Sequence, residues 1–383
     1  MGVADGRIAV VGGGIVGTAI AYQLAVRGHR DVLVVERGAI GEGSTAYATG
    51  GIRQQFSSRV NIELSRRAVA FYERFADEVG YPLDFRQHGY LFLLDSDAAR
   101  QQLAAGVRLQ HELGVPVQEL SPAQVHDLFP QVRTDDLVAG VYCPTDGSAS
   151  PADAVQGLWR AGRALGVTYR RHLEVGELVR SPQGEVRGVM AGGELIEATT
   201  VVVATGPSAA ETGQRFGVEL PVSPHRRQAF ALAPVDWLSP SLPMTVDLAT
   251  GAYVHPEASG GVIGGTDRDV PSGTDTSVDW DRLDRLVAAL GHRIPALADA
   301  SVARGWAGLR EMSPDDHALV GPIDDIPGLW VAVGFSGHGF MHAPAIGDSV
   351  AAWLLDGTPT VDLTPLDPMR FRTGQPVGES VAF

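Results

Sequence analysis

The chain has 383 residues, a formal net charge of −15 at pH 7 and a composition that is 44% hydrophobic. This length allows two domains with large cores, and the negative charge argues against nucleic acid or an anionic membrane as a partner. No apolar run reaches the length of a membrane span, and the first residues lack the pattern of a signal peptide, so we expect a cytoplasmic protein.

All 30 basic residues are arginine. Because a guanidinium is not deprotonated in proteins, Schiff-base and general-base chemistry of lysine is excluded, and so is a P-loop. Cys143 is the only cysteine, which leaves no intrachain disulfide and no thiolate metal site. We expect no bound metal and a buried, unreactive thiol.

The N-terminal segment 7–17 predicts a strand, a tight turn and the start of a helix, with the spacing G-x-G-x-x-G. Gly12 permits the turn, Gly14 lets backbone N–H groups approach a pyrophosphate, and Gly17 lets the helix lie close to the strand. The next predicted strand ends at Glu36, where a carboxylate can accept hydrogen bonds from ribose hydroxyls, which argues against NADP. Together these features predict a dinucleotide site; a βα turn without a ligand is the alternative.

The rest of the chain alternates between helical and strand patterns. Up to residue 200 it predicts a glycine-rich stretch at 38–51, helices at 64–79, 101–113, 121–130 and 151–165, and β-structure at 90–94, 167–169 and 187–196. Beyond that point it predicts a buried strand and glycine turn at 200–206, an antiparallel sheet within 226–266, a helix at 280–290, a strand at 330–333, a glycine-rich loop at 334–340 and a helix at 344–355. The dinucleotide domain is therefore expected to draw strands from the beginning, middle and end of the chain.

Three separated segments resemble the FAD-dependent D-amino acid oxidase superfamily, and most of all its sarcosine oxidase, dimethylglycine dehydrogenase and β-type proline dehydrogenase branch. They are the N-terminal unit, the strand-and-glycine motif at 201–206, and the loop at 334–340 with its helix. Further segments match in the family's order, at 43–45, 51–56, 88–90, 146–147 and 306–308. The resemblance covers nearly the whole chain.

The resemblance implies an α/β fold of two lobes, like that of p-hydroxybenzoate hydroxylase. A Rossmann-like FAD-binding domain is expected to be discontinuous, and an antiparallel-sheet substrate domain is expected to cover the flavin. We assign 1–85, 148–222 and 318–383 to the FAD-binding domain, and 86–147 and 223–317 to the substrate domain. FAD is expected to be non-covalent, because relatives attach it through a cysteine, where this chain has Gly308, or through a histidine, which 38–51 lacks.

The resemblance also implies which residues contact the cofactor. They lie in the N-terminal unit, the glycine-rich stretch, and the later glycine motifs: Gly12, Gly14, Ile15, Val16, Gly17, Glu36, Arg37, Ser44, Thr45, Gly51, Val175, Gly206, Gly308, Gly334, Gly337, His338, Gly339, Phe340 and Met341. The helix after Gly339 has a physical role here, because the partial positive charge of its N-terminus would stabilise an anionic reduced flavin.

Four side chains are candidates for the substrate site. Arg53 matches the arginine that binds the substrate carboxylate in relatives, although most arginines form only surface ion pairs. Tyr253 matches an aromatic residue of the substrate cavity, and packing within the sheet is its alternative. His255 shares a face with Tyr253 by alternation but is more often a structural residue. His338, between two glycines, is expected close to the flavin.

Two departures from sarcosine oxidases bear on the chemistry. Met341 replaces a second cationic contact to the carboxylate, which weakens the case for sarcosine as the substrate. The lysine that assists reaction with oxygen is absent, and its position falls near Gly264. A dehydrogenase that passes electrons to a carrier or partner subunit therefore gains weight over an oxidase.

The sequence thus predicts an FAD-dependent enzyme that oxidises the C–N bond of a secondary amine or amino acid, such as sarcosine, glycine or proline. Hydride would pass to the flavin, and water would hydrolyse the imine. One alternative is a flavoprotein dehydrogenase subunit of a hetero-oligomer that uses a carrier in place of oxygen. Another is an NAD-binding enzyme, which only the N-terminal unit supports. The oligomeric state, homomeric or heteromeric, stays open.

Overall fold

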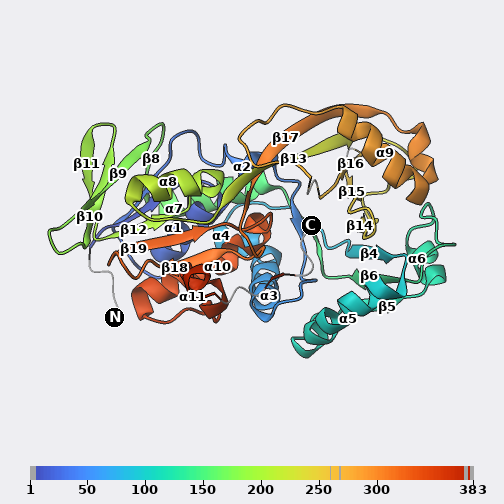
Figure 1. Cartoon of the computed structure of the whole chain (residues 1–383), viewed down its shortest axis with the longest axis horizontal. Coiled ribbons are helices and arrows are strands. Elements are labelled where there is room, and N and C mark those ends of the chain that lie inside the picture. Colours follow the sequence, from blue (N-terminus) through green and yellow to red (C-terminus); the bar gives the residue numbers. More distant parts are fainter. Residues whose placement is uncertain (1–5, 259, 267–268, 375–377, 380–383) are drawn as a thin grey trace.

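The computed structural model describes residues 6–258, 260–266, 269–374 and 378–379. They form two lobes, each built around one large β-sheet (Figure 1). Within the described part of the chain, no helix is long and apolar enough to cross a membrane. The cytoplasmic location stays a prediction.

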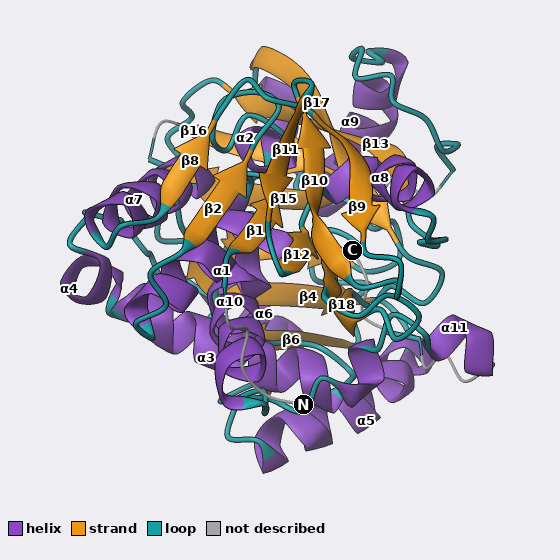
Figure 2. Cartoon of the chain, turned by 90° about the vertical axis from the view of Figure 1, so that its left-hand side faces the viewer, coloured by secondary structure: helices purple, strands orange, loops and turns teal. Residues whose placement is uncertain are grey.

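The first lobe contains the dinucleotide-type sheet. Its strands are β1 (Ile8–Val11), β2 (Val32–Val35), β8 (Thr168–Arg170), β12 (Thr200–Val203), β18 (Leu319–Pro322) and β19 (Leu329–Val333). Their order is β18-β19-β12-β1-β2-β8, and all neighbours are parallel except β18, which is antiparallel to β19 (Figure 2). Every residue of β1, β2 and β12 is buried, as a parallel sheet covered on both faces requires.

Alternate residues of these strands pack against different layers. Ile8 and Val10 pack in one core with α1 (Ile15–Val26), α3 (Arg59–Glu73), α7 (Pro151–Ala164) and α10 (Gly339–Asp356). Ala9 and Val11 pack in another core with α8 (Ala209–Phe216) and a three-stranded antiparallel sheet of β9 (Val175–Arg180), β10 (Val186–Ala191) and β11 (Glu194–Glu197). The carboxyl ends of the parallel strands therefore lie between a layer of helices on one face and α8 with the three-stranded sheet on the other.

The helix α10 begins five residues earlier than the apolar pattern predicts. Pro344 lies inside it and has no N–H to donate to the carbonyl oxygen of Phe340. The Tyr72 hydroxyl donates to that oxygen instead, at 2.7 Å. A side chain of α3 therefore completes the hydrogen bonding that would otherwise end a helix at proline.

The second lobe is built on an eight-stranded sheet in the order β17-β13-β16-β15-β14-β4-β6-β5. Neighbours are antiparallel except β14 and β4, which are parallel. The strands are β4 (Tyr90–Leu94), β5 (Gln118–Leu120), β6 (Ala139–Cys143), β13 (Ser223–Leu232), β14 (Met244–Asp247), β15 (Tyr253–Glu257), β16 (Gly260–Gly264) and β17 (Val302–Met312). The antiparallel sheet predicted within 226–266 is confirmed, and it extends to β17 and to three strands from the first half of the chain.

The other elements are short or lie around the lobes. They are α2 (Ser44–Tyr47), β3 (Gly51–Ile52), α4 (Phe75–Val79), α5 (Asp97–Glu112), α6 (Pro122–Leu128), β7 (Gly147–Ser148), η1 (Gly206–Ser208), α9 (Asp281–Arg293), η2 (Pro295–Asp299), η3 (Thr364–Leu366) and α11 (Arg370–Thr373). The single helix predicted at 64–79 is two helices, separated at Arg74. The helix predicted from Ser121 is confirmed, with a capping box between Ser121 and Gln124.

The two-lobe α/β fold agrees with the predicted class. All six strands of the first sheet come from 1–85, 148–222 and 318–383. All eight strands of the second sheet come from 86–147 and 223–317. The sequence did not predict β17 and β18, because their apolar residues are interrupted by Gly305, Gly308 and Gly321.

Candidate active site

The glycine-rich turn between β1 and α1 has the geometry of a pyrophosphate-binding turn. Gly12 has φ +111°, and a Cβ atom there would lie 2.3 Å from the carbonyl oxygen of Ala204. A Cβ atom at Gly17 would lie 2.0 Å from the carbonyl oxygen of Gly12, so neither position can hold a side chain. A Cβ atom at Gly14 would meet only the Thr45 hydroxyl, at 3.5 Å, which leaves room for a ligand at the N-terminus of α1.

Glu36 is fixed beside this turn. Its carboxylate accepts the backbone N–H of Gly13 at 2.6 Å and that of Gly38 at 2.7 Å. The N–H of Ile15, at the start of α1, donates to Thr45 Oγ1 at 3.1 Å. Each carboxylate oxygen of Glu36 keeps further acceptor capacity, so the residue fits the adenosine ribose of FAD.

Two of the expected cofactor residues lie where the second lobe meets the first. Ser44 donates through Oγ to the carbonyl oxygen of Leu309, at 2.6 Å. A Cβ atom at Gly308 would lie 2.5 Å from that of Tyr47, so glycine is needed where β17 passes α2. The glycine-rich stretch and β17, far apart in the sequence, are thus adjacent in space.

The other expected cofactor positions are more scattered. Val16 is buried in the first turn of α1, and Val175 is buried at the start of β9. Gly206 and Gly334 follow β12 and β19, with φ +54° and +72°. Arg37 is exposed and has no hydrogen bond or ion pair to any residue that the structure describes.

The N-terminus of α10, whose N-cap residue is His338, has no side-chain cap among the residues that the structure describes. The N–H groups of the first turn, which starts at Gly339, therefore offer partial positive charge to an anion. Gly337, just before the cap, has φ +95°. Phe340 and Met341 bury their side chains in the first lobe, so only their backbone can contact a cofactor.

Arg53 lies at the centre of the candidate site, two residues after Gly51 in β3. It is only 2% exposed. Its Nη1 donates to the carbonyl oxygen of Gln55 at 2.5 Å, and its guanidinium lies 4.1 Å from the ring centre of Phe56. Its Nη2 lies 3.3 Å from His338 Nε2. A guanidinium can only donate, so His338 accepts at Nε2 and carries its proton on Nδ1.

Electrostatics keep this histidine neutral. Burial lowers the pKa of His338 well below its ordinary value, and the charge of Arg53 lowers it further. The neighbouring His342, whose ring also packs against Phe56, has its pKa lowered to about 3 for the same reasons. Burial lowers the pKa of Arg53 as well, but Tyr90 and two acidic residues oppose this shift.

Arg310, on β17, is a candidate residue that sequence reasoning missed. Its side chain lies against Gly337, where a Cβ atom would approach Nε within 2.9 Å. The positive charge of Arg310 acts to lower the pKa of Arg53, Tyr90 and His338. It forms no hydrogen bond or ion pair with any described residue. Its position two residues after the matching segment 306–308 could have drawn attention to it.

Asp146 holds the Arg53 segment in place. This fully buried carboxylate accepts hydrogen bonds from the backbone N–H of Gln54 at 2.8 Å and from the side chains of Gln54 and Gln55 at 3.1 Å each. Burial raises the pKa of Asp146 to about 6, against the effect of these donors. Nearby Cys143 is buried, as expected, and burial also raises the pKa of its thiol.

Tyr253 lies on the same face of the second sheet as Tyr90. It pairs across the strands with Gly264, where a Cβ atom would lie 2.4 Å from the Tyr253 hydroxyl oxygen. The Tyr253 ring therefore occupies the space that a side chain at position 264 would need. Tyr90 packs its hydroxyl onto Gly51, and the pKa of Tyr90 responds to both Arg53 and Tyr253.

His255 lies apart from the Arg53 cluster. It is buried, and its ring stacks on that of His88 with centroids 6.0 Å apart. Burial, followed by the charge of His88, lowers the pKa of His255 to about 3. Neither ring nitrogen has a hydrogen-bond partner among the described residues. The geometry favours a neutral packing residue, and nothing in it brings His255 to Arg53.

The fold and this site define a flavin-dependent oxidoreductase. Residues 7–353 match the family described as FAD dependent oxidoreductase, and the chain belongs to that family. FAD is the cofactor of the family, so the prediction of an FAD-dependent oxidoreductase is confirmed. The glycine turn, Glu36 and the uncapped start of α10 fit that cofactor.

Relatives include rat mitochondrial dimethylglycine dehydrogenase (29% identity, covering 94% of this chain and 44% of the relative) and 4-methylaminobutanoate oxidase of Paenarthrobacter nicotinovorans (27%, 95% and 45%). The chain thus spans about half the length of these relatives. Glycine oxidase of Geobacillus kaustophilus is 28% identical, with coverage of 95% and 96%. The structure of L-proline dehydrogenase from P. horikoshii is similar with a TM-score of 0.91, 31% identity, and coverage of 98% and 100%.

Proposed function

We propose that this protein oxidises the C–N bond of a secondary amine or amino acid, with FAD as the hydride acceptor and an imine that water hydrolyses. The observation that carries this proposal is the pair of guanidinium groups, Arg53 and Arg310, beside the uncapped N-terminus of α10. Relatives named for dimethylglycine, glycine and proline support a small amino acid as substrate. We assign the first lobe to FAD and the second to substrate.

Arg53 and Arg310 bind the substrate carboxylate in this proposal. Arg53 is rigid, because Asp146, Gln55 and Phe56 fix its segment, and a fixed planar fork is suited to a carboxylate. Arg310 lacks an ion-pair partner among the described residues, so a substrate carboxylate would supply one.

The remaining groups shape the reaction space. Tyr253 and Tyr90 form an aromatic wall on the second sheet, which excludes water from the substrate. His338 stays neutral and directs Nε2 toward Arg53, so it orients the guanidinium and is not available as a base. FAD, when bound, would supply the hydride acceptor, and the N-terminus of α10 would offer its partial positive charge to the anionic reduced flavin. If the amine binds neutral, no side-chain base is needed.

A second candidate function is a dehydrogenase that transfers electrons to a carrier or a partner subunit. The observation that favours it is the contact between Tyr253 and Gly264, which leaves no lysine and no space for one beside the site. The similarity to L-proline dehydrogenase supports the same alternative.

The test is the visible spectrum of the purified protein under argon during additions of sarcosine, dimethylglycine, glycine and proline, followed by air. Bleaching by one of them is the expected result. Fast return of the flavin band in air supports an oxidase, and slow return that a quinone or dye accelerates supports the dehydrogenase. A protein that carries no flavin and cannot be reconstituted with FAD contradicts the proposal.

A further inference from the structure

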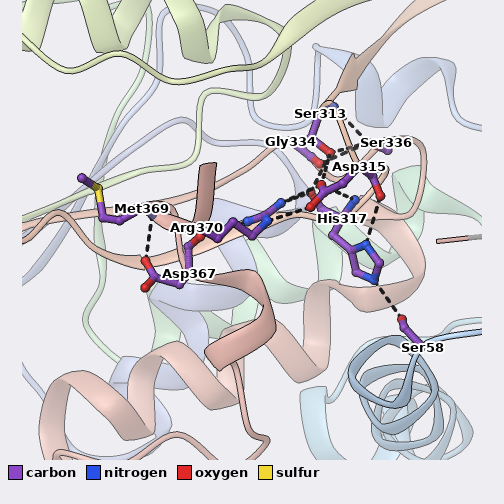
Figure 3. Close-up of polar contacts among 9 residues, drawn as sticks. All are labelled: Ser58, Ser313, Asp315, His317, Gly334, Ser336, Asp367, Met369 and Arg370. Atoms are coloured by element: carbon purple, nitrogen blue, oxygen red, sulfur yellow. Dashed lines mark hydrogen bonds and ion pairs between the residues drawn. The ribbon is translucent and has the colours of Figure 1, made fainter. Parts of the chain in front are cut away.

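A buried polar network lies beside the candidate site and is not used by the proposed chemistry (Figure 3). Arg370 donates through Nε and Nη2 to the two carboxylate oxygens of Asp315, both at 2.8 Å. His317 is 3% exposed; its Nδ1 lies 3.0 Å from the carbonyl oxygen of Asp315, and its Nε2 lies 3.0 Å from Ser58 Oγ. Ser58 is the N-cap residue of α3.

Glu379 approaches the same serine from the other side. Its carboxylate accepts the backbone N–H groups of Ser57 at 2.8 Å and Ser58 at 3.2 Å, and the Asn61 side chain at 3.0 Å. It also accepts both serine hydroxyls, with Ser58 Oγ at 2.9 Å. The backbone N–H of Glu379 donates to the carbonyl oxygen of Asp315 at 3.1 Å. An ionised carboxylate at a helix N-terminus is the form that these donors favour.

The number of protons in this network is fixed by its geometry. The Nδ1 atom of His317 faces a carbonyl oxygen, which only accepts, so Nδ1 carries a proton. The single Ser58 hydroxyl proton points to the Glu379 carboxylate, which also only accepts. The His317 Nε2 atom must therefore donate to Ser58 Oγ, and this requires a second proton on the ring.

We propose that His317 and Glu379 form an ion pair bridged by Ser58, which holds Glu379 against the N-terminus of α3. The pair is charge-balanced, since the neighbouring Asp315 is paired with Arg370. The other titratable groups that sense these charges are His338 and His342, both neutral in this structure, and Arg53.

Nitrogen-15 NMR of the histidine-labelled, FAD-loaded protein tests the ion pair directly, with His317→Gln to assign the signal. Near pH 7 both ring nitrogens are expected to show the shifts of an imidazolium, and Glu379→Gln is expected to restore a neutral ring. A neutral ring in the wild-type protein, or an unchanged ring in Glu379→Gln, overturns the proposal. This readout needs no substrate and no activity.

Trypsin provides a second test, because the chain has no lysine and the exposed Arg372 lies seven residues before Glu379 in the sequence. Glu379→Gln is expected to be cut after Arg372 about tenfold faster than wild type at pH 7.5, the effect of losing charge-assisted hydrogen bonds. Equal rates for wild type and Glu379→Gln contradict the proposed role of Glu379 at the N-terminus of α3.

Discussion

At the scale of single residues, the candidate site depends on two arginines with different surroundings. Arg53 is buried and held by its own segment, whereas Arg310 reaches the same region from β17. Sequence motifs identified Arg53 because it lies within a matching segment. They missed Arg310 because only the pairing of β17 with the rest of its sheet brings it to the Gly337 turn.

Replacing either arginine tests their shared role. Arg53→Gln and Arg310→Gln are each expected to lower kcat/KM for a carboxylate substrate by roughly 10- to 100-fold, since each removes a charge-assisted hydrogen bond. Steady-state kinetics with the substrate that bleaches the flavin measures this loss.

Arg100→Gln is the matched control, because Arg100 is an exposed arginine that pairs with Glu119 on the second lobe. An amine without a carboxylate should be oxidised equally by all three variants and the wild type. A loss of the same size for that amine would assign both arginines a structural role.

Asp146 predicts a pH effect on stability. Its pKa is raised by burial from 3.8 to about 6, so the folded protein binds the proton more tightly than the unfolded chain. The stabilising contribution of Asp146 is therefore fully present below about pH 4 and is lost as the pH rises through 6, on the order of 3 kcal/mol.

Asp146→Asn does not titrate, so it isolates this contribution. Urea denaturation at several pH values measures the unfolding free energies of wild type and Asp146→Asn. As the pH rises from 4 to 7, the wild type is expected to lose stability relative to Asp146→Asn. A difference that is constant with pH would show that the carboxyl has the same pKa in both states.

At the scale of elements, two glycines in the turn between β1 and α1 allow effects on folding to be distinguished from effects on cofactor binding. Gly17→Ala places a methyl group 2.0 Å from a carbonyl oxygen, whereas Gly14→Ala places one at an ordinary contact distance of 3.5 Å from the Thr45 hydroxyl. We expect Gly17→Ala to lower the melting temperature of the apoprotein, because overpacking costs about 1–3 kcal/mol or more.

Gly14→Ala serves as its counterpart. It is expected to leave apoprotein melting nearly unchanged and to weaken FAD binding, measured by fluorescence titration, because the methyl group enters the space for the pyrophosphate. Equal FAD affinity in Gly14→Ala and wild type would place the cofactor elsewhere.

The helix α10 supplies a second test at this scale. Tyr72→Phe removes the donor to the Phe340 carbonyl oxygen, and an unsatisfied buried carbonyl costs about 1–3 kcal/mol. With Pro344→Ala the backbone N–H of residue 344 can take over, so Tyr72→Phe should cost less in that background. Unfolding free energies of the two single variants and the double variant measure this coupling, and purely additive effects would refute it.

At the scale of the whole molecule, the lobe of the first sheet is expected to bind FAD and the lobe of the second to bind the substrate. FAD would lie where the two lobes meet. The only cysteine is buried in the second lobe, and the glycine-rich stretch has no histidine. We therefore expect acid or heat denaturation to release all yellow colour into the supernatant. Flavin that stays with the precipitated protein would reveal a covalent bond.

The sequence alone determined the dinucleotide-binding unit and the two-lobe fold class, because these depend on local patterns, whereas FAD followed from the resemblance to a family of FAD-dependent enzymes. The spacing of Gly12, Gly14 and Gly17, and the apolar run of β12, encode a turn and a buried parallel strand without help from distant residues. The helix caps at Ser121 and Ser150 are equally local. Such features depend on neighbours along the chain and can be predicted from the sequence.

Only the tertiary structure decided the composition of the site. Arg310, Tyr72 and Glu379 carry no local motif, and each acquires its role from a partner far along the chain. His255 shows the reverse, since alternation placed it with Tyr253 but packing placed it on His88. Distant contacts set burial, hydrogen-bond partners and charge, and these in turn decide which side chains can act.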